Sequence, residues 1–250
     1  MTPIFEHIVN NYKITNVLDV GCGNGFYSCY FSERGHDVKG IDGSQYGLEW
    51  AKERGIKDTY LIKDFDHYKL PYEDNTFSFI ICKDLLEHLY YPKNLLNEIH
   101  RVLAPNGICL VLVPNHFPIL MRLKFLFTLN IDTQRFFPEA SEWDLPHIRF
   151  FTQKGLLWGL DKCGFKPIMN YAKYFPFIFR GGNRIPLVRT VISWFAKIWP
   201  VHFATAFVYL IEKKQKDLNT QTSSSNERPE NQNPSPENSQ QSSAFNLPIN

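Results

Sequence analysis

One stretch near the amino terminus decides the fold, Val17-Leu18-Asp19-Val20-Gly21-Cys22-Gly23-Asn24-Gly25, and Phe26 follows it at once. An apolar strand here runs directly into a glycine-dense turn, and an amphipathic segment over 26–34 comes next. Because glycine lacks a Cβ, such a turn can adopt positive φ and bring its backbone N–H groups close to a ligand at the positive end of the following helix. The stretch therefore predicts a loop that binds a nucleotide cofactor.

An acid at the end of the next strand supports this prediction. The strand expected at 37–41 is followed by Asp42, whose carboxylate can accept hydrogen bonds from both ribose hydroxyls of an adenosine. The glycine spacing is G-x-G-x-G, and Phe26 stands where a dinucleotide-binding loop needs its last glycine. A nicotinamide-dependent oxidoreductase is therefore the less favoured alternative.

Strand and helix signals alternate along the chain in the order typical of a doubly wound sheet. We expect strands at 16–20, 38–41, 59–62, 77–82 and 108–113, then a strand from Phe165 and a last one over 201–211. Ser44 and Thr152 can cap helices, Gly164 can end one, and Pro186 can open another. These signals predict an α/β fold with a mostly parallel, seven-stranded, Rossmann-like sheet and helices on both faces.

The residues after the fourth expected strand carry a resemblance to a known family. Phe79-Ile80-Ile81-Cys82-Lys83-Asp84-Leu85-Leu86-Glu87-His88-Leu89 resembles the strand and Glu-His pair of the class I S-adenosylmethionine-dependent methyltransferases of the small-molecule, type-11-like kind. Arg101–Gly107 is similar to the helix end and turn that follow in that family. The resemblance covers about residues 16–113, and more loosely 147–165. It implies S-adenosylmethionine as the cofactor and methyl transfer as the activity.

The resemblance also implies roles for side chains at three strand ends. Asp19 would attract the ammonium of the methionyl group, Asp42 would bind the ribose, and Asp64 with Phe65 would bind the adenine. Asp66 is the alternative adenine acid, and turn capping is a second role open to Asp19 and Asp42. The complete set of expected cofactor-binding residues is Asp19, Gly21, Cys22, Gly23, Asn24, Gly25, Asp42, Gly43, Asp64, Phe65 and Lys83.

Histidines are the candidate catalytic residues. Methyl transfer from a sulfonium mainly requires that the acceptor be aligned and lose its proton, and a histidine can take that proton near neutral pH. His147 and His88 are the predicted catalytic residues, and His116 is a third candidate. In the family the Glu87-His88 pair also supports the fold near the cofactor. No metal site is expected.

Motifs that the chain lacks exclude some classes of methyl acceptor. It has no Asn/Asp-Pro-Pro-aromatic turn, which is typical of amino-directed methyltransferases, and no Pro-Cys pair, which cytosine C5 enzymes need. We therefore expect methylation of a small molecule, lipid precursor or saccharide, with oxygen as the favoured acceptor atom. The alternative is a noncatalytic S-adenosylmethionine-binding regulator or partner subunit, because resemblance of fold does not establish turnover.

Composition agrees with one enzyme domain over 1–213, which includes a substrate-side insertion at 114–146. Of the 250 residues 44% are hydrophobic, whereas 214–250 is rich in Ser, Asn, Gln, Pro and Glu and is expected to be a disordered tail. The net charge of +2 gives no electrostatic reason for a nucleic-acid partner. The five cysteines contain no C-x-x-C pair, so reduced thiols and a cytoplasmic location are expected.

An aromatic stretch at 171–199 carries basic residues and is typical of an interfacial helix, so peripheral membrane contact is one interpretation. Packing of the same helix on the sheet, before the last strand, is the favoured interpretation. The apolar run Val191–Ile211 is long enough to span a membrane, but Lys197, Pro200 and His202 interrupt it, so a transmembrane span is not expected.

Overall fold

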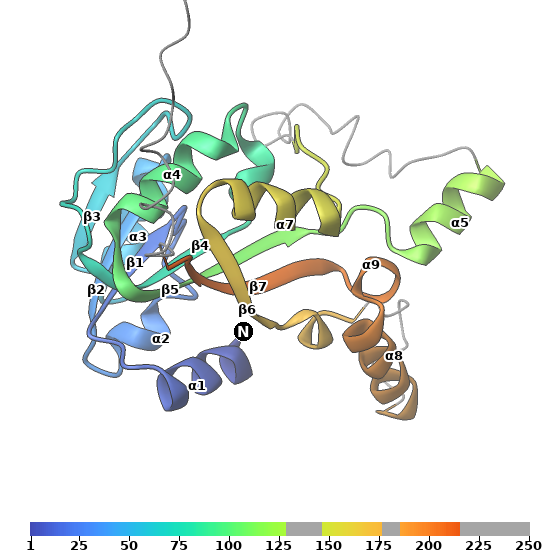
Figure 1. Ribbon diagram of the computed structural model, residues 1–250. Helices are drawn as coiled ribbons and strands as arrows, with labels where there is room; N and C mark the ends of the chain where they lie inside the picture. Colours follow the sequence, from blue (N-terminus) through green and yellow to red (C-terminus); the bar gives the residue numbers. More distant parts are fainter. Residues whose placement is uncertain (129–146, 177–185, 216–250) are drawn as a thin grey trace, which may run out of the picture. The chain divides into compact units, whose positions relative to one another are not determined.

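The computed structural model describes residues 1–128, 147–176 and 186–215, and their centre is a seven-stranded sheet (Figure 1). Its strand order is β3-β2-β1-β4-β5-β7-β6. Strands β1 to β5 run parallel to one another, and β7 runs antiparallel to both β5 and β6. This confirms the expected mostly parallel α/β sheet. The strands are β1 (Asn16–Val20), β2 (Asp37–Asp42), β3 (Asp58–Leu61), β4 (Phe77–Lys83), β5 (Leu103–Pro114), β6 (Phe165–Asn170) and β7 (Ala206–Lys213).

Helices cover both faces of the sheet, as a doubly wound fold requires. Side chains of α4 and α7 form one buried cluster with the sheet, and side chains of α1, α2 and α3 form the other. The helices are α1 (Thr2–Asn11), α2 (Cys29–Ser32), α3 (Gln45–Glu53), α4 (Pro92–Val102), α5 (Ile119–Thr128), α7 (Gln153–Lys162), α8 (Pro186–Ile198) and α9 (Pro200–Phe203). Two short 3-10 turns, η1 (Leu86–His88) and η3 (Ala172–Tyr174), join them.

The apolar strand sequences are explained by burial on both faces. In β4, Ile80 and Cys82 belong to the cluster under α4 and α7, whereas Phe79 and Ile81 belong to the cluster under α1, α2 and α3. A parallel strand in the middle of such a sheet therefore reads as a continuous apolar run. The carboxyl ends of β1, β2 and β4 meet at one edge, which is where ligands bind in open α/β sheets.

The expected helix ends are confirmed. The hydroxyl of Ser44 accepts a hydrogen bond from the N–H of Gly47 at 3.1 Å, and the hydroxyl of Thr152 accepts one from Gly155 at 3.0 Å. Gly164 follows α7 with φ of +81°, a conformation that favours glycine.

Three expected boundaries are wrong. The fifth strand, expected over 108–113, begins earlier, at Leu103. The helix expected over 26–34 is only the short α2, because residues 26–28 form turns and the chain turns again after Ser32, where the N–H of Gly35 donates to the carbonyl oxygen of Ser32. The last strand, expected over 201–211, begins at Ala206 because Pro200 opens α9, and proline suits the first turn of a helix.

Several predictions fall partly outside the described residues. The insertion predicted at 114–146 starts with the end of β5 and α5, and its remainder from 129 lies outside them. Within the predicted tail, 216–250 lies outside the described residues, as does 177–185 of the aromatic stretch.

Candidate active site

The glycine loop is tied to the end of β2. The N–H groups of Gly21 and Cys22 both donate to the carbonyl oxygen of Ile41, at 2.8 and 3.0 Å. The carboxylate of Asp42 accepts from the N–H of Gly23 at 2.7 Å and from the N–H of Ser44 at 2.8 Å. Asp42 therefore has the turn-capping role that the sequence left open, and it lies against the loop, where its remaining acceptor capacity can serve a ribose.

A cavity of about 220 Å³ opens at this loop. The residues that line it include most of the predicted loop residues, Lys83, and three residues that the sequence analysis did not predict. The lining residues are Asp19, Gly21, Cys22, Gly23, Asn24, Tyr27, Ile81, Lys83 and Asp84. The missed residues lie within or beside motifs that the sequence displayed, since Tyr27 follows the loop and Ile81 and Asp84 lie at the carboxyl end of β4. Lys83 forms an ion pair with Asp84, and its ammonium lies 4.5 Å from the centre of the Tyr27 ring.

Gly23 leaves this cavity open to a ligand. Its φ is +51°, and a Cβ built on it meets no heavy atom within 4 Å. The backbone of the loop can therefore approach a bound molecule directly, as a cofactor loop requires.

Asp19 is a buried acid at the back of the cavity. Burial raises the pKa of its carboxyl to about 7; nearby Asp42 acts in the same direction, while Lys83 opposes the shift. A buried carboxyl in this state is stabilised in its charged form by a cation, so the site fits the ammonium of a methionyl group.

Cofactor binding is expected to weaken as the pH falls below about 7, because Asp19 must lose its proton to pair with that ammonium. The folded free protein holds the proton up to a higher pH than the complex, so binding at about pH 6 releases protons. Calorimetry with S-adenosylhomocysteine in two buffers of different ionisation enthalpy measures this release. Equal affinity at pH 6 and 8, with equal enthalpy in both buffers, would contradict the assignment.

The residues predicted to bind adenine have other contacts in the structure. Asp66 is buried, and its carboxylate accepts from the N–H groups of Tyr90 and Tyr91 at 2.9 and 2.6 Å, so it serves the fold. Phe65 is only 8% exposed and packs in the core, which leaves little ring surface for adenine. Asp64 is exposed and pairs with His67 at 3.0 Å. The adenine-binding roles of Asp64 and Phe65, and the place of Gly43 beside them, stay predictions.

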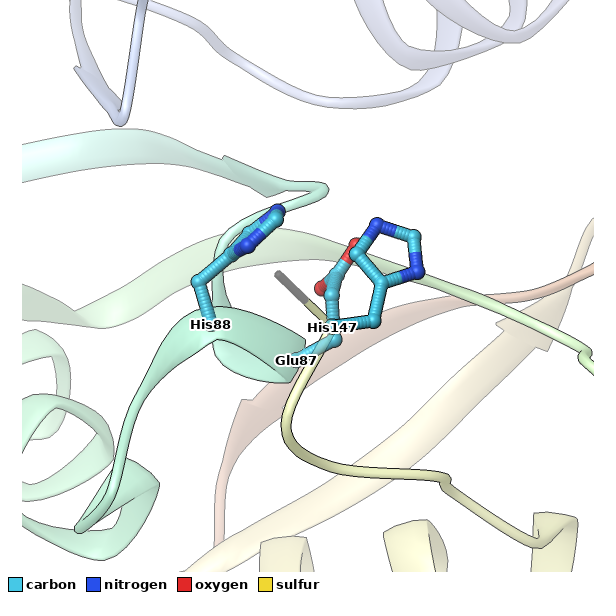
Figure 2. A group of neighbouring side chains, drawn as sticks. All are labelled: Glu87, His88 and His147. Atoms are coloured by element: carbon cyan, nitrogen blue, oxygen red, sulfur yellow. The ribbon is translucent and has the colours of Figure 1, made fainter. Parts of the chain in front are cut away.

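A second group of polar side chains lies beyond β4, where Glu87 and His88 on η1 meet His147 (Figure 2). The ring centres of His88 and His147 are 4.8 Å apart, and Nε2 of His116 lies 2.7 Å from Nδ1 of His147. The structure thus brings together all three histidines that the sequence singled out. Their catalytic roles stay predictions.

Backbone hydrogen bonds hold this group in place. The N–H groups of Ile148 and Arg149 both donate to the carbonyl oxygen of Glu87, at 2.9 and 3.0 Å. The guanidinium of Arg149 donates to the carbonyl oxygens of Leu89 and Tyr90. The segment that carries His147 is therefore fixed on η1, although the two are far apart in the sequence.

The residues at the loop fit S-adenosylmethionine. A buried carboxylate can hold its ammonium, the open backbone at Gly23 lets the bound molecule approach closely, and Asp42 can bind its ribose. When bound, this cofactor supplies a methyl group on a positively charged sulfur, which makes the methyl carbon electrophilic.

The sheet order, the glycine loop and the acids at the strand ends define the class of this protein. It carries a class I S-adenosylmethionine-dependent methyltransferase domain, and residues 18–111 match the family described as "Methyltransferase domain".

Curated relatives agree with this class, and a solved structure shares the fold. The chain is 30% identical to a "Ubiquinone biosynthesis O-methyltransferase" of Rickettsia conorii over 43% of this chain and 37% of the relative. It is 25% identical to the mitochondrial protein of that name from Schizosaccharomyces pombe, over 70% of this chain and 72% of the relative. An S-adenosylmethionine-dependent methyltransferase structure from Mesorhizobium loti shares the fold, with a TM-score of 0.57 and 16% identity over 84% of this chain and 96% of that one. The chain spans about half or less of the first curated relatives it matches.

Proposed function

We propose that this chain transfers a methyl group from S-adenosylmethionine to an oxygen atom of a small, lipid-like precursor. The observation that carries the proposal is the meeting of His88, His116 and His147 beyond the same strand whose end lines the cofactor cavity. The ubiquinone O-methyltransferases among the relatives support an oxygen acceptor of this chemical class.

In the proposed reaction Asp19, Asp42 and the loop orient the cofactor, and the histidine group promotes loss of the acceptor proton. His147 is oriented by its 2.7 Å contact with His116, so its ring has a fixed direction when the acceptor arrives. Fixed alignment of nucleophile and methyl carbon supplies much of the rate in a reaction of this type. Removal of the proton makes the acceptor oxygen a better nucleophile.

The proposal is tested with methyl-labelled S-adenosylmethionine and a fractionated lysate of the source organism. The Asp42→Ala variant is the blank, because it loses the side chain that holds Gly23 and Ser44. Label that enters the organic phase only with the unchanged protein supports a lipid-like acceptor, and label in the aqueous phase favours a saccharide or other polar acceptor. Cofactor binding without label in any fraction would support the noncatalytic alternative.

We also infer peripheral membrane contact through α8. Leu187, Val191, Trp194 and Ile198 are all exposed large apolar residues, and their spacing places them along one side of the helix. Lys197 lies beside them and can contact anionic headgroups. A membrane surface is the occupant that fits this face, because the proposed lipid-like acceptor would partition into membranes. The balanced charge of the chain gives no reason to add a nucleic-acid partner.

No helix in the described ranges is long and apolar enough to cross a membrane. We expect the protein to float with anionic liposomes, and we expect Trp194→Ser to reduce the bound fraction several-fold because an interfacial tryptophan is lost. Trp158→Ser on α7 is the matched control, since Trp158 is 64% exposed and Trp194 57%. An unchanged protein that stays at the bottom of the gradient, or equal loss in both variants, would count against α8 as the contact.

A further inference from the structure

Three side chains beyond β4 lie close enough together to hold a metal ion after small side-chain movements. Glu87, His88 and His147 each offer one ligand atom, and these atoms all lie within 4.8 Å of one another (Figure 2). We propose that they bind a divalent transition-metal ion, with Zn²⁺ as the best match, and that this ion binds the acceptor oxygen. The proposal that the ion binds here does not depend on the proposed function. The role of the ion in the reaction does depend on it.

The donor set fits this class of ion. One carboxylate with two imidazoles is a known set for catalytic zinc, and it leaves a coordination position open for water or substrate. The same set can bind Fe²⁺, Mn²⁺ or Co²⁺, whereas Mg²⁺ and Ca²⁺ prefer oxygen ligands alone. Methyl transfer needs no redox change at the metal, so a redox-inert Lewis acid is sufficient.

Glu87 gives an independent indication of a missing cation. Its side chain is fully buried, and within the described part of the chain neither carboxylate oxygen has a hydrogen-bond partner. Buried polar groups in folded proteins are nearly always satisfied, and an unsatisfied one needs an explanation such as an ion. A cation held between Glu87 and the two histidines supplies the partner that both oxygens lack.

The surroundings of His147 match those of a metal ligand. Its Nδ1 lies 2.7 Å from Nε2 of His116. When Nδ1–H donates to that nitrogen, the lone pair of His147 is on Nε2, the ring nitrogen that a metal ion would bind. In Figure 2 one ring nitrogen of His147 lies on the side of the Glu87 carboxylate and the other is turned away. Metal-bound histidines usually have such an outer partner, which fixes the tautomer and the ring direction.

Backbone hydrogen bonds hold η1 and the segment that carries His147 together without a metal ion. The paired hydrogen bonds from Ile148 and Arg149 to the carbonyl oxygen of Glu87 hold the ligand segments together. Little conformational entropy is then lost when the ion binds, which favours a real site over a chance encounter of side chains.

The ion changes how the acceptor loses its proton. A hydroxyl oxygen bound to Zn²⁺ has a lowered pKa, so its O–H bond breaks near neutral pH and the proton passes to water. An oxygen lone pair then forms the new C–O bond to the methyl carbon. The C–S bond of S-adenosylmethionine breaks, its electron pair stays on sulfur, and S-adenosylhomocysteine leaves. His88 and His147 thus act as ligands and His116 as a positioning residue.

The test is metal binding by the full chain without acceptor or cofactor. Chelator-treated protein is titrated with Co²⁺ and then with Zn²⁺, and visible Co²⁺ absorption with bound metal by elemental analysis gives the stoichiometry. We expect one ion per chain, absorption bands of a nitrogen- and oxygen-ligated site, and displacement of Co²⁺ by Zn²⁺. Glu87→Gln and His147→Asn are each expected to weaken binding at least about tenfold.

His36→Asn is the matched control, since His36 contacts Phe31 on the other side of the sheet and should bind metal as the unchanged protein does. Circular dichroism shows whether each variant is folded, and His88→Asn replaces any that is not. Absence of bound metal, or equal binding by the unchanged protein and Glu87→Gln, overturns the site. Metal binding without methyl transfer would count against the proposed function alone, and full methyl transfer by metal-free protein would count against the metal's part alone.

Discussion

Asp19→Asn is expected to lower the affinity for S-adenosylhomocysteine at about pH 8 by roughly a hundredfold or more. The carboxylate is buried beside the cavity, and the substitution removes the charge that would pair with the ligand's ammonium. Leaving one member of a buried ion pair without its partner costs about 3 to 5 kcal/mol. Isothermal titration calorimetry measures the change directly.

The fold of this variant is expected to survive. Burial raises the pKa of Asp19 to about 7, so in the free protein its charged form is disfavoured by folding. The unfolded chain loses this proton at a lower pH than the folded chain, and stability from this group therefore falls as the pH rises from about 4 to 7. Asparagine cannot ionise, so Asp19→Asn should unfold no earlier than the unchanged protein at pH 8.

Asp37→Asn is the matched control for cofactor affinity, because Asp37 is exposed at the amino end of β2, away from the cavity. It should bind S-adenosylhomocysteine as the unchanged protein does. If Asp19→Asn also kept its affinity, Asp19 would be left with turn capping alone, and the assignment of the ammonium site would be wrong.

Gly25→Ala is expected to reduce the free energy of unfolding by roughly 2 to 4 kcal/mol. Gly25 has φ of +71°, and a Cβ there would lie 2.6 Å from Cδ1 of Ile56 and 3.1 Å from the backbone Cα of Ala51. The first contact could be relieved by a rotation of Ile56, but the second is with backbone and requires that α3 move. Urea denaturation followed by circular dichroism measures the loss.

Comparing Gly23→Ala with Gly25→Ala separates the cost of positive φ from the cost of a steric clash. It also has positive φ, but its Cβ would meet no heavy atom within 4 Å, so we expect a loss of only about 1 kcal/mol. The same methyl group would lie in the cavity and should weaken cofactor binding. Equal unfolding midpoints for the two variants would show that close packing under Gly25 does not matter.

The sequence predicted the sheet and its cofactor edge because both depend on local signals. The apolar runs, the glycine loop and Asp42 lie within short segments, and the structure places them as expected. The start of the last strand was wrong since an apolar run does not distinguish a buried helix from a strand, and Pro200 decides between them. Local sequence could not show whether Asp64 or Asp66 has a structural role. The hydrogen bonds that give Asp66 this role come from the N–H groups of Tyr90 and Tyr91, which are distant in the sequence.

The histidine group shows the same limit. His88, His116 and His147 were each predicted as candidates, but nothing local showed that they meet, or that Glu87 beside them is fully buried without a hydrogen-bond partner in the described chain. Their convergence depends on the hydrogen bonds between the 147–149 segment and η1. The expectation that the chain has no metal site was drawn without that convergence, and we now propose the opposite.

The central claim is that this chain methylates an oxygen of a lipid-like precursor with S-adenosylmethionine. The most direct measurement is mass spectrometry of the product formed from S-adenosylmethionine with a deuterated methyl group and a prenylated phenol. We predict that the intact deuterated methyl group appears on the phenolic oxygen, with one S-adenosylhomocysteine formed for each product. Transfer to nitrogen or carbon, or binding of the cofactor with no transfer to any of a series of hydroxylated lipid precursors, would contradict the claim.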